Sequence, residues 1–219
     1  MPTSALYNTL SARLTQLDGH LLPPIDPTLN YSDKDRDLTR AYCLLCHAEI
    51  ESYIEGIILQ VATDAYTKWF ANKQIISPII FHLAYSFKNE NGKKEPPFSM
   101  VVKSFKNLEA AISSNNGIKE PNTTSLLKPI GFEMDTTLQS TLHGFGKTRG
   151  QIAHTSFQTQ QPLDPATEKA NINQILTALQ LFDTDIVDYE QNGTLNRTPV
   201  NMQWGAKSIW QKIKDFFTK

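Results

Sequence analysis

The chain has 219 residues, of which 40% are hydrophobic and 20% are charged, and its formal net charge is −1. This length and composition are typical of a soluble globular protein that buries a sizeable core. Because acidic and basic residues nearly balance, the chain lacks the excess positive charge of proteins that coat DNA or RNA. Any contact with nucleic acid is therefore expected from a local patch or from the surface of an assembled dimer.

The sequence predicts a cytoplasmic protein with no membrane partner. It contains no run of 18 apolar residues that would span a bilayer. Its N-terminal stretch, MPTSALYNTLSARLTQL, lacks the basic and apolar segments of a secretory signal. The two cysteines, Cys43 and Cys46, fall inside a helical pattern, where we interpret them as reduced core thiols and not as a redox motif.

Helical patterns cover nearly the whole chain. A Pro-rich turn, LLPPIDP, ends the first helix, Ser32 and Asp35 form a near capping box at the start of the second, and Asp164 caps a later one. Strand-like alternation is scarce, so the predicted fold is all-α, a bundle of long antiparallel helices. The predicted helices span about 4–19, 32–70, 74–87, 98–113, 123–129, 135–157, 165–191 and 201–218.

The predicted organisation is a single helical domain over residues 1–193, within which 71–122 is a helical insertion. Loops at 88–97 and 114–123 are expected to be exposed. Residues 194–219 form a C-terminal helical extension with an amphipathic pattern and several lysines. We expect this extension to dock on the bundle or on a partner subunit, in preference to a membrane surface.

A charged residue interrupts the apolar face of the helix predicted at 135–157. Arg149 occupies this face, and an ionised side chain there costs free energy unless it is paired or opens into a cleft. His154 lies about 140° further round the helix, and Gly150 between them permits a close backbone approach. The apolar positions of the face are Leu138, Leu142, Phe145 and Ile152.

The helix predicted at 32–70 shows the same irregularity. His47 and Glu51 are one turn apart and interrupt its apolar face, and Arg40 precedes His47 by two turns. The simplest arrangement brings the two polar seams together, so that Glu51 or His47 compensates Arg149. On periodicity alone, this network is either a buried structural ion pair or part of a site.

Several segments resemble one family. RGQIAH at 149–154, late in an all-α bundle, resembles the R-x4–6-H signature of HEPN-domain ribonucleases. RAYCLLCHAEIESYIE at 40–55 resembles the long second helix of the RiboL-PSP type of HEPN domain. LLKPIGFEMDTTLQSTLHGFGKTRGQIAHTS at 126–156 is similar to the approach to the motif in that branch, and DPATEKANINQILTALQLFDTDI at 164–186 to its last bundle helix. Residues 71–122 and the last 25 residues lie outside this resemblance.

The R-x4–6-H pattern is short, so its context decides which match is meaningful. The matches in this chain are Arg13–His20, Arg40–His47 and Arg149–His154. The first ends beside a Pro-rich loop, the second lies on one helical face that is placed to line the same cleft, and only the third has family-like flanks. Gly150 is a departure, because many HEPN nucleases have a polar residue directly after the arginine.

The resemblance implies a HEPN-like bundle and a metal-independent endoribonuclease that acts as a homodimer, with two motifs facing each other across one cleft. It implies Arg149 and His154 as the catalytic residues. RNA supplies its own nucleophile, the 2′-hydroxyl, so histidine need only move protons while arginine holds the scissile phosphate. The expected products carry a 2′,3′-cyclic phosphate and a 5′-hydroxyl. The residues that we assign to supporting the site are His47, Glu51, Arg40 and Lys147.

No histidine or carboxylate group shows metal-ligand spacing and no phosphate-binding glycine loop occurs, so we expect no metal and no cofactor. The resemblance implies a toxin or antiphage-defence effector that cuts tRNA or mRNA, with an antitoxin or a nucleotidyltransferase as its partner. The alternative is a non-catalytic HEPN module that binds RNA, a nucleotide or a protein partner. A third interpretation is a purely structural helical dimerisation protein.

Overall fold

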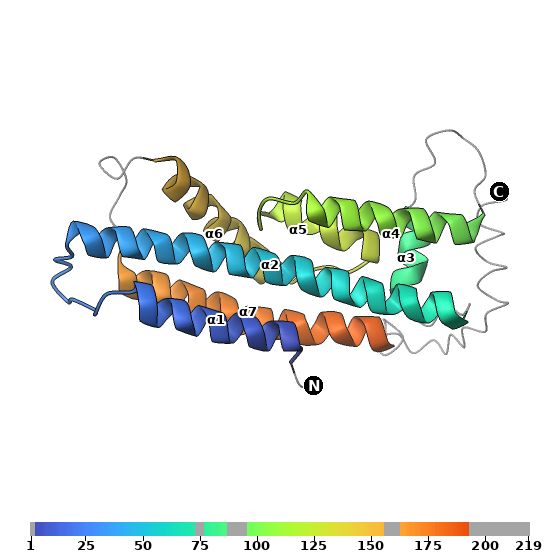
Figure 1. Ribbon diagram of the computed structural model, residues 1–219, viewed down its shortest axis with the longest axis horizontal. Helices are drawn as coiled ribbons and strands as arrows, with labels where there is room; N and C mark the ends of the chain where they lie inside the picture. The colour runs from blue at the N-terminus through green and yellow to red at the C-terminus, as the bar shows by residue number, and fades with distance from the viewer. Residues whose placement is uncertain (1–2, 73–76, 87–95, 156–162, 193–219) are drawn as a thin grey trace. The chain divides into compact units, whose positions relative to one another are not determined.

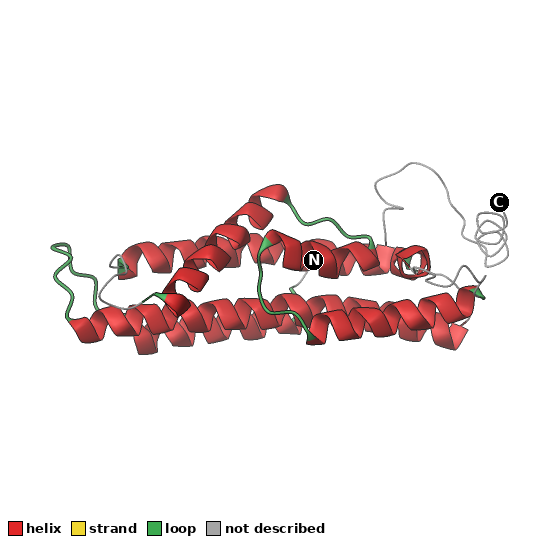
Figure 2. Cartoon of the chain, turned by 90° about the horizontal axis from the view of Figure 1, so that it is seen from above, coloured by secondary structure: helices red, strands yellow, loops and turns green. Residues whose placement is uncertain are grey.

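The computed structural model describes residues 3–72, 77–86, 96–155 and 163–192. Within these ranges the chain forms seven α-helices and one short 3-10 helix, and it contains no strand (Figures 1 and 2). The all-α prediction is therefore confirmed. The helix predicted at 201–218 lies outside the described residues.

The chain divides into two compact units, and the long helices α2 and α7 contribute residues to both. Of the described residues, unit 1 comprises those in 3–56, 116–123 and 134–184, and unit 2 comprises those in 57–115, 124–133 and 185–192. The helices are α1 (Ala5–Leu21), α2 (Asp33–Asn72), α3 (Pro78–Ser86), α4 (Pro97–Ser113), α5 (Glu120–Leu127), α6 (Thr136–His154) and α7 (Pro165–Asn192), and the 3-10 helix η1 spans Lys128–Ile130.

The helices start where the sequence places caps. At α2, the Ser32 hydroxyl accepts a hydrogen bond from the Asp35 backbone N–H at 3.2 Å, and the Asp35 carboxylate accepts one from the Ser32 N–H at 3.1 Å. These reciprocal bonds satisfy two donors that a helix start leaves open. Asp135 and Asp164 cap the first turns of α6 and α7 by accepting hydrogen bonds from two backbone N–H groups each. The three predicted starts are confirmed.

Three predictions along the chain are corrected. The short helix predicted at 123–129 is α5 and begins at Glu120, because Pro121 fits the first turn, where no N–H is needed. The loop predicted to be exposed at 114–123 is partly core, since Ile118 and Thr123 are each only 1% exposed. The helix predicted to reach residue 157 ends at His154, because the backbone of Thr155 is extended.

Unit 1 is built around a buried carboxylate that joins α1, α2 and α7, which lie side by side (Figure 1). Asp183 of α7 is fully buried. It accepts hydrogen bonds from the backbone N–H of Ser4 at 2.7 Å, from the Ser4 hydroxyl, and from the Tyr53 hydroxyl at 2.9 Å. A buried charge is tolerated only when it is hydrogen-bonded in this way. The carboxylate therefore fixes the N-terminus of α1 and the middle of α2 to α7.

The two cysteines lie in the core of unit 1 as free thiols. Both side chains are fully buried, and burial raises the pKa of each. The Cys43 thiol donates a hydrogen bond to the buried Glu168 carboxylate, with Sγ and Oε2 3.5 Å apart. A thiol with a raised pKa forms little thiolate, so this pair has the character of core residues, as expected.

Unit 2 contains an aromatic cluster and a tight turn. Tyr66 of α2 stacks on Phe105 of α4 with ring centroids 4.4 Å apart. Gly131, which follows η1, has a φ of 73°, and a Cβ there would lie 2.2 Å from the His82 ring. Only glycine fits both constraints, which explains why a glycine follows Lys-Pro-Ile in the sequence.

Among the described helices, none has the length and apolar character needed to cross a membrane.

Candidate functional site

Helix α6 of unit 1 carries both residues of the R-x4-H motif. Arg149 is half-buried and continues the face formed by the buried Phe145 and Ile152. His154 is the last residue of the helix and is exposed. Five residues of helix separate them by about 7.5 Å along the axis. Neither side chain is sealed inside the unit.

His47 of α2 is the buried neighbour of this motif. Its side chain is 3% exposed, its Nδ1 lies 3.6 Å from Glu51 Oε2, and its ring centroid lies 5.8 Å from that of Phe145 on α6. Burial, and to a smaller extent the positive charges of Arg149 and Lys119, together lower the pKa of His47 from 6.5 to about 4. The imidazole is therefore uncharged at neutral pH.

The polar residues that interrupt the apolar faces of α2 and α6 influence each other electrostatically. The pKa of Glu51 is raised by burial and by Glu55, and the charge of Arg149 opposes this rise. Arg149 thus influences both polar residues of the α2 seam. The structure shows no hydrogen bond or salt bridge between Arg149 and another described residue. Its charge is balanced through space and its guanidinium donors remain available.

Lys119 belongs to the same cluster, although the sequence pattern predicted only that it lies in an exposed loop. It immediately precedes α5, and its side chain crosses α6 at Gly146. A Cβ on Gly146 would lie 2.9 Å from Lys119 Cγ, so only glycine allows this approach. The one signal for it in the sequence was a glycine within an amphipathic helix, which often marks a close packing contact.

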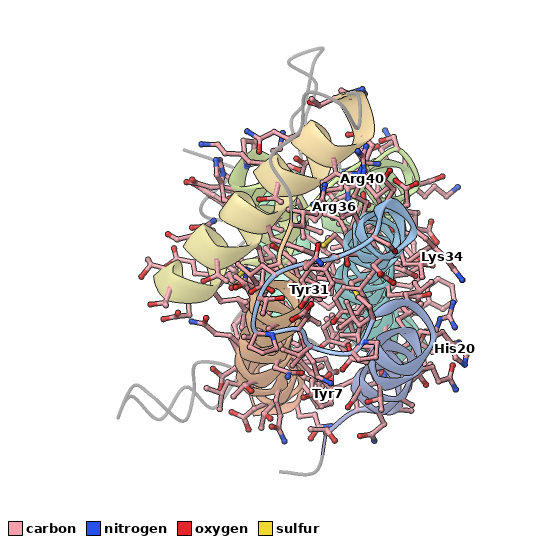
Figure 3. The ribbon with its side chains drawn as sticks, turned by 90° about the vertical axis from the view of Figure 1, so that its left-hand side faces the viewer. Tyr7, His20, Tyr31, Lys34, Arg36 and Arg40 are labelled. Atoms are coloured by element: carbon pink, nitrogen blue, oxygen red, sulfur yellow. The ribbon has the colours of Figure 1, made fainter. Side chains whose placement is uncertain are left out.

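Arg40 of α2 holds the C-terminal end of α6. Its Nη2 donates hydrogen bonds to the carbonyl oxygens of Ile152 and Thr155, both at 3.1 Å. Figure 3 labels Arg40 among the side chains of α2. The last carbonyls of a helix have no partner within the helix, and the extended backbone at Thr155 prevents another turn from supplying one. Arg40 thus caps the turn that carries His154. It was predicted to support the site through the cleft, and the observed contact is with the helix end.

Other basic and histidine residues of unit 1 have different surroundings. Lys147 is exposed on α6, and no salt bridge joins it to another described residue. The ring of His143 accepts a hydrogen bond from the backbone N–H of Glu120, with Nδ1 and N 3.4 Å apart. Arg13 pairs with Glu49 at 3.0 Å on the surface of unit 1. Within the described ranges, no group of three or more potential ligands could hold a metal ion.

The helical fold and the R-x4-H motif define the class of protein as a HEPN domain. The family model described as RiboL-PSP-HEPN matches residues 9–188, and the chain belongs to this family. The matched range includes residues 71–122, which the sequence analysis had placed outside the resemblance. No curated protein and no solved structure matches the chain. Membership of the family points to a nuclease or RNA-related role.

The low pKa of His47 predicts an acid-sensitive fold. The folded protein binds this proton only near pH 4, whereas the unfolded chain binds it near 6.5. The unfolded state is therefore favoured progressively as the pH falls from about 6.5 to 4, with a loss of at most about 3 kcal/mol in the free energy of unfolding. Urea unfolding of His47→Gln across this range should show a shallower dependence than wild type. His20→Gln, a change at an exposed histidine, is the control, and equal slopes for wild type and His47→Gln would contradict the assignment.

The cap formed by Arg40 predicts a local effect at the end of α6. Arg40→Ala removes both donors, so amide hydrogen exchange at residues 153–155 should accelerate about tenfold, as expected for the loss of roughly 1.5 kcal/mol. Arg40→Lys should restore part of the protection, because it keeps one charged donor. Arg13→Ala, which breaks only a surface ion pair, should leave these amides unchanged. Exchange at wild-type rates in Arg40→Ala would rule out the cap.

Proposed function

We propose that this chain is a metal-independent endoribonuclease in which Arg149 and His154 are the catalytic residues. The observation that carries the proposal is the state of Arg149, which is half-buried beside an uncharged imidazole and makes no salt bridge with another described residue. A purely structural arginine at such a position is normally paired directly. A guanidinium with free donors at the edge of a core is instead suited to bind a phosphate.

The proposed reaction needs only groups that the chain and the RNA supply. The 2′-hydroxyl loses its proton to one histidine, and its oxygen forms a bond to phosphorus. The bond from phosphorus to the 5′-oxygen breaks, and the leaving oxygen takes a proton from a second histidine. The products are a 2′,3′-cyclic phosphate and a 5′-hydroxyl. Arg149 would stabilise the negative charge that builds up on the phosphate oxygens.

A homodimer follows from this scheme, because one imidazole cannot act as base and acid in the same step. His154 lies about 140° round the helix from Arg149, so it points away from the guanidinium of its own chain. An exposed His154 at the end of α6 is accessible to a second copy. We therefore propose that two copies bring their motifs to one cleft, with the symmetry-related His154 side chains as base and acid.

The biological role rests on family membership. We propose a toxin or antiphage-defence effector that cuts tRNA or mRNA in the cytoplasm. An antitoxin or a nucleotidyltransferase would be the protein partner that restrains it. His47 and Glu51 would support the site by tuning the charge around Arg149, and Lys147 would add positive charge at its rim.

One observation favours the alternative, a non-catalytic HEPN module that binds RNA, a nucleotide or a protein. The charge of Arg149 acts on both His47 and Glu51, as it would in a structural network. The two proposals differ in what Arg149→Ala does. In the structural network it mainly lowers the melting temperature, whereas in the nuclease it removes cleavage from a protein that stays folded.

The nuclease proposal predicts that the purified full-length protein cleaves total RNA in the presence of EDTA. His154→Ala should slow cleavage about 100-fold or more, the usual contribution of a general acid or base. Arg149→Ala should have an effect of similar size, because it removes a group that stabilises the transition state. His20→Ala, which changes the exposed histidine of the Arg13–His20 match, should cleave like wild type.

Mapping of the RNA ends checks the chemistry, and circular dichroism checks that each variant is folded. The proposal fails if chelation abolishes all cleavage, or if His154→Ala cleaves at the wild-type rate.

A further inference from the structure

Lys119 and Arg149 reach the same part of unit 1 from different elements. Lys119 lies just before α5, and its side chain passes over Gly146, which is three residues before Arg149 on α6. Three residues are less than one helical turn, about 4.5 Å along the axis. Both positive charges lower the pKa of the buried His47 ring, so both lie close enough to act on it through space.

Neither cation is paired directly with another described residue. The Lys119 side chain is exposed, and it makes no salt bridge or hydrogen bond with another described residue, as is true of Arg149. His47 between them stays uncharged, so it adds no positive charge and neutralises none. The chain also keeps a glycine in the middle of a helix, which is less favourable than alanine there, where Lys119 crosses. Two adjacent unpaired cations favour a ligand with repeated negative charges.

We propose that Lys119 binds the backbone phosphate next to the one held by Arg149, and that Gly146 keeps Lys119 in place to do so. This inference deepens the proposed function and rests on it. The ligand class is a single-stranded phosphodiester chain, and the contact is independent of base identity. Lys119 is a binding residue here and takes no part in proton transfer.

The test uses the full-length protein and a fluorescein-labelled, 2′-O-methyl single-stranded oligonucleotide, which cannot be cleaved. Lys119→Gln should weaken binding about three- to tenfold at low salt, and should reduce the slope of log affinity against log salt by about 0.7, the value for one phosphate contact. Gly146→Ala should have the same effect, because the added Cβ would lie 2.9 Å from Lys119 Cγ.

The matched control is Gly144→Ala on the same helix, where an added Cβ meets nothing within 4 Å. It should bind like wild type. The double variant Lys119→Gln/Gly146→Ala should bind no more weakly than Lys119→Gln alone, since both changes remove one contact. Wild-type affinity and salt slope for Lys119→Gln would overturn the inference, and wild-type binding by Gly146→Ala would overturn the role of the glycine.

Cleavage of total RNA by the wild-type protein separates this inference from the proposed function. If wild type cleaves and Lys119→Gln binds normally, only the role of Lys119 fails. If the wild type binds with the predicted dependence on Lys119 but does not cleave, the nuclease fails and the phosphate contact stands.

Discussion

The candidate site is arranged around the buried and uncharged imidazole of His47. His47 stays uncharged because burial and two nearby cations all disfavour its protonated form. A protonated ring would place a third positive charge near Arg149 and Lys119, and among the described residues only Glu51 is in salt-bridge range of the ring to oppose it. Keeping the ring neutral lets α2 and α6 pack through His47 and Phe145 while the charge of Arg149 remains available for an anion. The same seam thus serves packing and, in our account, RNA binding.

Helix α6 is held at its start, near its middle and at its end. Asp135 caps its first turn, Lys119 crosses it at Gly146, and Arg40 holds its last carbonyls. A site that stabilises charge in a transition state benefits from groups fixed before the substrate arrives, because no reorganisation is needed during the reaction. The contact of Arg40 lies next to His154, the residue proposed to transfer protons. Residues that are not part of the motif therefore help to hold the helix that carries it.

Sequence patterns predicted the parts of the structure that local rules determine. The caps at Ser32 and Asp164 gave the helix starts, and the broken apolar periodicity singled out Arg149 and His47. The approach of Lys119 to Gly146 could not be predicted, because contacts between distant segments leave no periodic signal. The end of α6 at His154 was missed for a related reason: no glycine or proline stops the helix, and the donors from Arg40 satisfy the carbonyls left by its termination. Whether Arg149 and His154 carry chemistry is a property of the assembled site, which no local pattern determines.

The central claim is that Arg149 and His154 contact the same RNA phosphate. Side-chain NMR of the full-length protein, labelled at arginine and histidine and titrated with a 2′-deoxy dinucleotide that cannot react, tests it most directly. Our account predicts that the Arg149 guanidinium and the His154 ring signals shift together and saturate at one ligand concentration, while the exposed His20 ring does not shift. A dinucleotide that binds without moving either signal, or that moves only one of them, would contradict the account.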